Sequence, residues 1–155
     1  MNKVIKWIKK LFNKQQSQIS THMSGIVYVD LGASSIKMSY NGKFITFRSS
    51  VRVASYEEVT FQENKILVDG KWYIIGESAT STGNYKYKFQ KENLHVLVIY
   101  GLQLLEFQED EVQLHILLPY NELGTIRELK SKLEKTYQLY DTKMKLQVAK
   151  VYVEG

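Results

Sequence analysis

Short apolar runs separated by turn residues dominate the first half of the folded part of the chain. Ile26–Leu31 is almost entirely apolar and predicts a strand buried in a sheet. Ile36–Tyr40 and Lys43–Arg48 lie on either side of Asn41-Gly42, a dipeptide typical of a two-residue hairpin turn. The same pattern predicts a second hairpin, with strands Lys65–Val68 and Trp72–Ile75 around Asp69-Gly70.

The second half of the chain has longer segments with the spacing of helices. Gln90–Phe107 is apolar and long enough for a helix, and Tyr120–Leu139 reads as a charged amphipathic helix. Val112–Leu118 and Lys143–Val153 predict strands, the first of them ended by Pro119. The predicted order is three strands, a further pair, and then helix–strand–helix–strand. This order indicates an α/β fold, with helices packed on the faces of a mixed sheet.

The chain begins with a segment of different character. Over residues 1–14, a helical period gathers the apolar side chains into one arc of about 160° and leaves the lysines outside it. A basic amphipathic helix of this kind is typical of a membrane interface; packing on its own domain or in a partner's groove is the alternative. Residues 15–24 are polar and aperiodic, which predicts a linker before a domain at 25–155. The apolar arc consists of Val4, Ile5, Trp7, Ile8, Leu11 and Phe12.

The charge follows the same division. The net charge is +5, from 21 basic and 16 acidic residues, and five lysines precede the first acidic residue, Asp30, so that 16 of each sign remain. A uniformly basic domain that binds nucleic acid by sequence is therefore not expected. The chain has no cysteine, which excludes disulfides and thiolate metal sites, and no apolar run long enough to span a bilayer. These features predict a cytoplasmic protein, and the amphipathic start adds the hypothesis of a peripheral position at the inner face of the cell membrane.

The turn after the first predicted strand carries more chemistry than a connection needs. Gly32 lets the backbone approach an anion, and successive N–H groups of such a turn can bind phosphate. Ser34 and Ser35 add hydroxyl donors and Lys37 adds a cation, whereas Asp30 would hold Mg²⁺, usually through water. A structural hairpin whose Asp and Ser side chains bind turn amides is the alternative interpretation.

This turn resembles the first phosphate loop of the actin-like ATPases, a superfamily that includes Hsp-type chaperones and sugar kinases. Asp30, Gly32 and Lys37 match its pattern of strand, Asp, any residue, Gly, four residues and Lys. Ala33 stands where many members have a hydroxyl residue, so Ser34 would serve instead. The resemblance implies ATP or GTP with Mg²⁺ held by Asp30. The implied cofactor-binding set is Asp30, Gly32, Ala33, Ser34, Ser35 and Lys37.

Four further segments look like the ParM branch of that superfamily. Arg48-Ser49 lacks the proline that the branch usually has before the serine. In the last segment the matching residue of the family orients the attacking water, which implies a catalytic role for Glu154. The implied fold is ribonuclease-H-like, the first domain of an actin-like protein, over residues 25–155. In chain order, the segments are Phe47–Val51, Lys71–Ala79, Leu117–Tyr120 and Val151–Gly155.

The resemblance also implies a function. It describes the N-terminal nucleotide-binding half of a ParM-like bacterial, plasmid or phage cytoskeletal protein that acts in DNA segregation or filament formation. In the family, the second phosphate loop and the adenosine pocket come after the last matching segment. We therefore expect an incomplete site and little ATP hydrolysis from these residues alone. Expected partners are further copies or a second actin-like half, and an anionic membrane through residues 1–14. The alternative is a non-enzymatic, membrane-tethered module that binds or caps filaments.

Two other groups have several interpretations. Lys86, Lys88 and Lys91 alternate with aromatic residues, which fits a strand or loop with one solvated face, a filament contact or base stacking. His95 and His115 lie in apolar segments, and we expect them to be core residues with one satisfied nitrogen.

Overall fold

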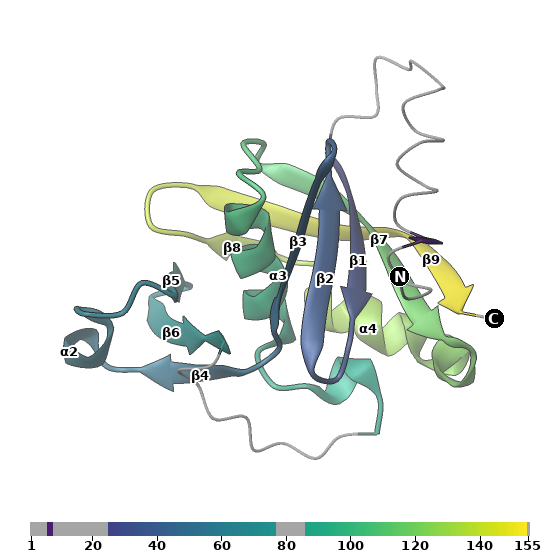
Figure 1. Cartoon of the computed structure of the whole chain (residues 1–155), viewed down its shortest axis with the longest axis horizontal. Coiled ribbons are helices and arrows are strands. Elements are labelled where there is room, and N and C mark those ends of the chain that lie inside the picture. The colour runs from purple at the N-terminus through teal and green to yellow at the C-terminus, as the bar shows by residue number, and fades with distance from the viewer. Residues whose placement is uncertain (1–5, 8–24, 77–85, 155) are drawn as a thin grey trace.

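A computed structural model describes residues 6–7, 25–76 and 86–154 of the chain. Lys6 and Trp7 are helical, but the rest of the predicted helix 1–14 and the predicted linker 15–24 lie outside the described residues. The described part contains a six-stranded sheet, a three-stranded sheet and a few helices (Figure 1). The predicted mixed α/β fold is confirmed.

The six-stranded sheet begins with a meander. β1 (Ile26–Leu31), β2 (Ser35–Tyr40) and β3 (Lys43–Arg48) pair antiparallel in sequence order. β7 (Glu111–Pro119) lies parallel to β1 on its other side, and β9 (Lys143–Glu154) lies parallel to β7. A short edge strand, β8 (Thr136–Gln138), completes the order β3-β2-β1-β7-β9-β8.

Both predicted hairpin turns are present and have the expected backbone conformation. Asn41 and Gly42 have φ angles of 50° and 84°, and Asp69 and Gly70 have 49° and 80°. Two successive residues with positive φ make a type I′ turn, whose twist matches that of the strands it joins. The second of these turns joins β5 (Lys65–Val68) to β6 (Lys71–Ile75).

The smaller sheet contains an element that the sequence pattern did not predict. β4 (Val51–Ala54) leaves β3 and pairs with β6, which gives the order β4-β6-β5. α2 (Tyr56–Val59) follows β4 and begins with a capping box between Ser55 and Glu58. The β5–β6 turn is fastened to the larger sheet by two bonds: the Asp69 N–H donates to the Gln138 carbonyl at 2.8 Å, and the Gln138 N–H donates to Asp69 Oδ1 at 2.8 Å.

The helices are shorter than the sequence pattern predicted. α3 runs over Leu94–Leu104, inside the predicted Gln90–Phe107, and is preceded by a 3₁₀ turn, η2 (Lys88–Gln90). The predicted single helix over Tyr120–Leu139 is wrong, because this segment forms three elements. The chain there contains η3 (Tyr120–Thr125), α4 (Ile126–Leu133) and β8 (Thr136–Gln138).

Tyr137 shows why the helix ends early. Its ring is buried, and its hydroxyl donates a 2.9 Å hydrogen bond to the carbonyl of Leu133, the last residue of α4. Its backbone pairs with Met144 in β9, so the residues after α4 satisfy their hydrogen bonds in the sheet. Pairing with a distant strand outweighs the local helical pattern here.

The larger sheet has two faces, and the side chains of each strand point alternately to one and the other. The core face packs under α3 and α4, and alternate residues such as Val27, Val29, Leu114 and Ile116 belong to the hydrophobic core there. The residues between them point to the other side, which we call the second face. Its residues in the central strands include Tyr28, Asp30, Lys37, Ser39, His115, Leu117, Lys150, Tyr152 and Glu154.

A bulge in β9 sets which of its residues reach the second face. Leu114 pairs with Val148, but the next residue, His115, pairs with Lys150, so that Ala149 has no partner. A bulge of this kind inserts one residue into one strand and shifts the alternation beyond it.

Among the described residues, no helix has the length and apolar character needed to cross a bilayer.

Candidate functional site at the carboxyl edge of the parallel strands

The carboxyl ends of the three parallel strands meet at one edge of the larger sheet. Asp30 in β1 is in register with Leu117 in β7, and Pro119 at the end of β7 is in register with Glu154 at the end of β9. The loop after β1 therefore lies at the same edge as Glu154. Ligands of open α/β sheets bind outside this edge of the strands.

The loop between β1 and β2 is held tightly. A Cβ on Gly32 would collide with the backbone carbonyl oxygen of Ser35, so the turn requires glycine at this position. The Ser49 hydroxyl donates to the Ala33 carbonyl at 2.8 Å, and the Ser49 N–H donates to the Ser34 carbonyl at 3.1 Å. Two carbonyl groups of the loop thus accept hydrogen bonds from Ser49, which lies in the segment between β3 and β4.

Asp30 and Lys37 face each other across the hairpin. They are in register on β1 and β2, and Lys37 Nζ lies 3.9 Å from Asp30 Oδ2 and 3.3 Å from Ser35 Oγ. Their side chains are 15% and 20% exposed, so the pair is only partly screened by water. A carboxylate and an ammonium group are therefore held at fixed positions beside the loop.

The charges around Asp30 come from several elements. Burial raises the pKa of Asp30 above its usual value, and the nearby Glu154 carboxylate also raises it. Lys37 and Lys88 lower this pKa and offset part of the rise. Since Glu154 and Lys88 act on the same carboxyl group, the structure brings both of them close to the β1–β2 loop.

Lys88 is a member of this edge that sequence reasoning did not identify. The sequence pattern of Lys86, Lys88 and Lys91 predicts a solvated segment, a filament contact or base stacking, and none of these places Lys88 beside the β1–β2 loop. Lys88 starts η2, and its charge lowers the pKa of Asp30. The Lys88 N–H donates to Oε1 of Glu122, a residue of η3 that is only 4% exposed. Alternation of lysines with aromatic residues was the available signal, but only the fold shows where this segment packs.

The residues at this edge fit a nucleotide phosphate with Mg²⁺. Among the described residues, the N–H groups of Ala33 and Ser34 donate no hydrogen bond, while their carbonyls accept hydrogen bonds from Ser49. These two N–H groups are thus available as donors, as an anion-binding loop requires. Among the described residues there is no cluster of three metal-binding side chains. Mg²⁺ commonly needs only one or two carboxylates when phosphates and water supply the other ligands, a role that Asp30 can fill.

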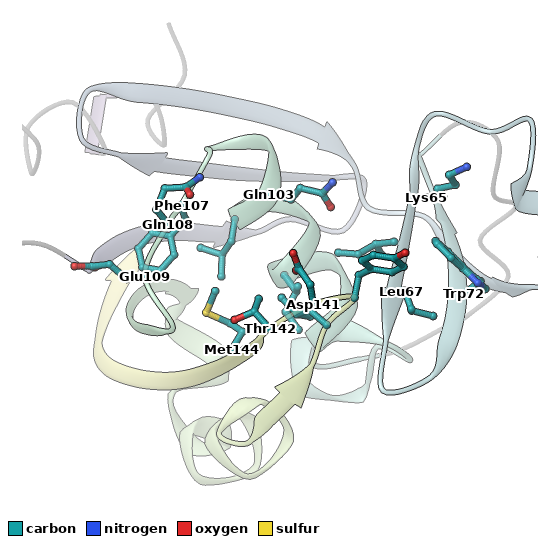
Figure 2. A pocket seen from close by; sticks show the side chains of 15 residues that line it. Lys65, Leu67, Trp72, Gln103, Phe107, Gln108, Glu109, Asp141, Thr142 and Met144 are labelled. Carbon is teal, nitrogen blue, oxygen red and sulfur yellow. The ribbon is translucent and has the colours of Figure 1, made fainter.

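A separate cavity is lined by other elements than this edge. It has a volume of about 610 Å³ and lies between the β5–β6 hairpin, the end of α3 and the β8–β9 turn (Figure 2). Its lining includes Trp72, Leu102 and Met144, with Lys65 and Asp141 among its charged side chains. None of the predicted phosphate-loop residues lines this cavity.

We predict that Asp30→Asn stabilises the folded chain at pH 7. Because burial raises the pKa of Asp30 in the folded state, this group opposes folding at pH values where it is ionised. This loss of folding stability is absent at pH values below 3.8, the ordinary pKa of an aspartate. It grows as the pH rises from 3.8 through the higher pKa that Asp30 has in the folded chain. Thermal unfolding of both chains between pH 3 and pH 8 should show a melting-temperature gain that closes at acidic pH.

Glu58 provides a control of opposite sign. Its pKa is lowered, first by the Ser55 N–H and then by Arg52, so its ionised form favours folding above 4.5. Glu58→Gln should therefore lower the melting temperature at pH 7, with the difference vanishing as the pH falls through the folded pKa. A melting temperature of Asp30→Asn below that of the wild type at pH 7 would contradict the burial argument.

The fold and this edge define an actin-like domain. The family described as actin-like proteins N-terminal domain matches residues 29–154, and the chain belongs to this family. A comparison with curated protein sequences gives no match.

Solved structures give the same fold. The chain is similar to the apo ParM protein of pSK41 (19% identity, TM-score 0.56), covering 83% of this chain and 48% of that one. It is similar to an AlfA filament bound to AMPPNP (17% identity, TM-score 0.62), and the match covers 86% of this chain and 55% of that one. It is also similar to the archaeal actin homologue Ta0583 in complex with ADP (16% identity, TM-score 0.54), with 83% of this chain and 43% of that one covered. The chain spans about half the length of these proteins.

Proposed function

We propose that the chain is the nucleotide-binding half of a ParM-like actin-like protein that forms filaments and acts in DNA segregation. The observation that carries this proposal is the meeting of the Gly32 loop, Asp30, Lys37 and Glu154 at the carboxyl edge of three parallel strands. An AlfA filament carries AMPPNP and Ta0583 carries ADP, which supports a nucleotide as the ligand class.

Each residue has a role in this proposal. The N–H groups of residues 32–35 and the Lys37 ammonium group bind the phosphates of ATP or GTP, and Asp30 holds Mg²⁺. Glu154, at the end of β9, orients the attacking water. Lys88 adds a second cation near Asp30. The proposed domain limits are 25–155 for the actin-like module, after a helix at 1–14 and a linker at 15–24.

Titration of the isotopically labelled full chain with Mg²⁺–ATP tests the nucleotide site. We expect amide shift changes at residues 32–35 and at Lys37, with weak affinity because the chain spans half of its relatives. A hydrogen bond to a charged group contributes about 1.5–3 kcal/mol, so Lys37→Ala should weaken binding by about 10- to 150-fold.

Lys43→Ala is the matched control. Lys43 lies at the other end of the same hairpin, where its ammonium group makes an exposed ion pair with Glu106 at 3.7 Å. Its removal should leave the affinity within about twofold, since exposed ion pairs contribute little. Shift changes that cluster away from the loop, or unchanged binding by Lys37→Ala, would refute the proposed site.

The amphipathic start extends the proposal to a location. Residues 1–14 would hold the domain at an anionic membrane surface through the apolar arc that contains Trp7. A membrane-tethered module that caps or binds filaments without hydrolysing nucleotide is the alternative, and loss of nucleotide binding in the titration would favour it.

A further inference from the structure

Trp7 lies on the second face of the larger sheet. Its ring centroid is 6.2 Å from that of Tyr28 in β1 and 5.3 Å from that of Tyr152 in β9, with interplanar angles of 84° and 70°. These are edge-to-face contacts, which aromatic pairs favour. In Figure 1 the short purple segment of Lys6 and Trp7 lies beside β9.

The rings beneath Trp7 form one cluster across three adjacent strands. Tyr28 and His115 make an edge-to-face contact, with ring centroids 5.3 Å apart, and the ring centroids of His115 and Tyr152 are 5.9 Å apart. Tyr152 Oη lies 3.4 Å from His115 Nδ1. Lys150 Nζ lies 4.7 Å from the centroid of the Tyr152 ring. We call Tyr28, His115 and Tyr152 the aromatic face.

The aromatic face belongs to the side of the sheet that α3 and α4 do not cover. Their buried side chains join the core with Val27, Leu114 and other residues of the core face. Tyr28 nevertheless has only 4% of its surface exposed, as a residue of the interior would. Burial, and after it the Lys150 ammonium group, lowers the pKa of His115, which favours the neutral form of its ring.

We propose that the aromatic face is the docking surface for this chain's own N-terminal segment, residues 1–14, with Trp7 as its anchor. Of the two described residues of that segment, Trp7 lies on the aromatic face, and it is half-buried and helical. The charges match as well. The segment carries five lysines and no acid, and the second face ends in Asp30 and Glu154, each two residues beyond a tyrosine of the cluster.

This docking bears on the membrane proposal, because one indole ring cannot be on the sheet and in lipid at the same time. The apolar arc of residues 1–14 includes Trp7, so release from the aromatic face would have to precede insertion. The docking itself does not depend on a membrane or on a nucleotide.

The full chain allows a direct test. Trp72 is the only other tryptophan, so Trp72→Phe leaves Trp7 as the single indole fluorophore. In that background, acrylamide should quench Trp7 much less than in the denatured chain. Loss of one edge-to-face pair, in Tyr152→Ser, should reduce the ratio of docked to released indole by about 2- to 13-fold and raise quenching.

Phe44→Ser is the matched control. Phe44 is a partly exposed aromatic residue on the same side of the sheet, in register with Ser39, but in β3, away from the cluster. Its removal should leave the quenching of Trp7 unchanged. Should Tyr152→Ser fail to fold, nuclear Overhauser cross-peaks between the Trp7 indole and the Tyr28 and Tyr152 rings, measured in the wild-type chain, test the same contact.

Two results would overturn the proposal. One is a Trp7 ring as accessible to acrylamide as in the denatured chain, with no cross-peaks to either tyrosine. The other is cross-peaks that appear only between differently labelled copies in a mixed sample, which would mean that a second copy supplies the indole ring.

Vesicles containing phosphatidylserine separate the docking from the membrane proposal. If both hold, vesicles should remove the cross-peaks of Trp7, and Tyr152→Ser should co-sediment with vesicles more than Phe44→Ser does. If Trp7 keeps its cross-peaks with vesicles present, the docking stands and the membrane proposal fails.

Discussion

Gly32→Ala is expected to destabilise the chain and to abolish the nucleotide-induced shifts of the β1–β2 loop. The added methyl group would overlap the Ser35 carbonyl oxygen, a backbone atom that cannot move without reshaping the turn. Overpacking of this kind costs about 1–3 kcal/mol. In a chain of this size it corresponds to a fall in melting temperature of about 2–12 °C, which calorimetry can measure.

Gly124→Ala makes the same change where space is available. A Cβ at Gly124 would meet no atom within 4 Å, so this variant should melt close to the wild type. Equal melting temperatures for Gly32→Ala and Gly124→Ala, with loop shifts retained, would show that the turn adapts and that glycine is not required there.

Ile116→Ala should have the largest effect on stability. Ile116 has no exposed surface, and it lies in β7 between β1 and β9, on the core face. Truncation of a buried isoleucine costs about 2–5 kcal/mol, because burial is lost and a cavity remains. The free energy of unfolding of a small protein is only about 5–15 kcal/mol in total. Urea denaturation of Ile116→Ala should therefore show a much lower midpoint than that of the wild type.

Two comparisons make this result specific. Ile116→Val should cost only about 0.5–1.5 kcal/mol, since it removes one methyl group. Val53 lies in β4 of the smaller sheet and is 53% exposed, so Val53→Ala should change the free energy of unfolding by about 0.5 kcal/mol or less. A midpoint for Ile116→Ala equal to that of Val53→Ala would contradict the position of β7 in the core.

The features that sequence reasoning predicted well are local ones. Alternation and the Asn41-Gly42 and Asp69-Gly70 turns identified both hairpins, because a type I′ turn fixes its strands within a few residues. The same locality places Asp30 opposite Lys37, since a hairpin sets their register. Whether these two residues bind nucleotide stays a prediction.

The features that it missed depend on distant partners. β8 pairs with β9 and so ends a pattern that reads as continuous helix, while Ser49 reaches the Ala33 carbonyl from 16 residues away. Lys88 and Glu122, which are 34 residues apart, meet only in the folded chain. Spacing along the chain contains no signal for such contacts, because they arise from packing between elements.

The single unpaired residue in β9, Ala149, decides the chemical character of the whole strand end. Before it, even-numbered residues such as Leu146 and Val148 enter the core; after it, the odd-numbered Val151 takes their place beside Ile116. A strand with the same amino acids but no bulge would pair Ala149 with His115 and Lys150 with Ile116. Lys150, Tyr152 and Glu154 would then point to the core face, and Val151 and Val153 to the second face. The bulge therefore places the Glu154 carboxylate and the Tyr152 ring on the second face.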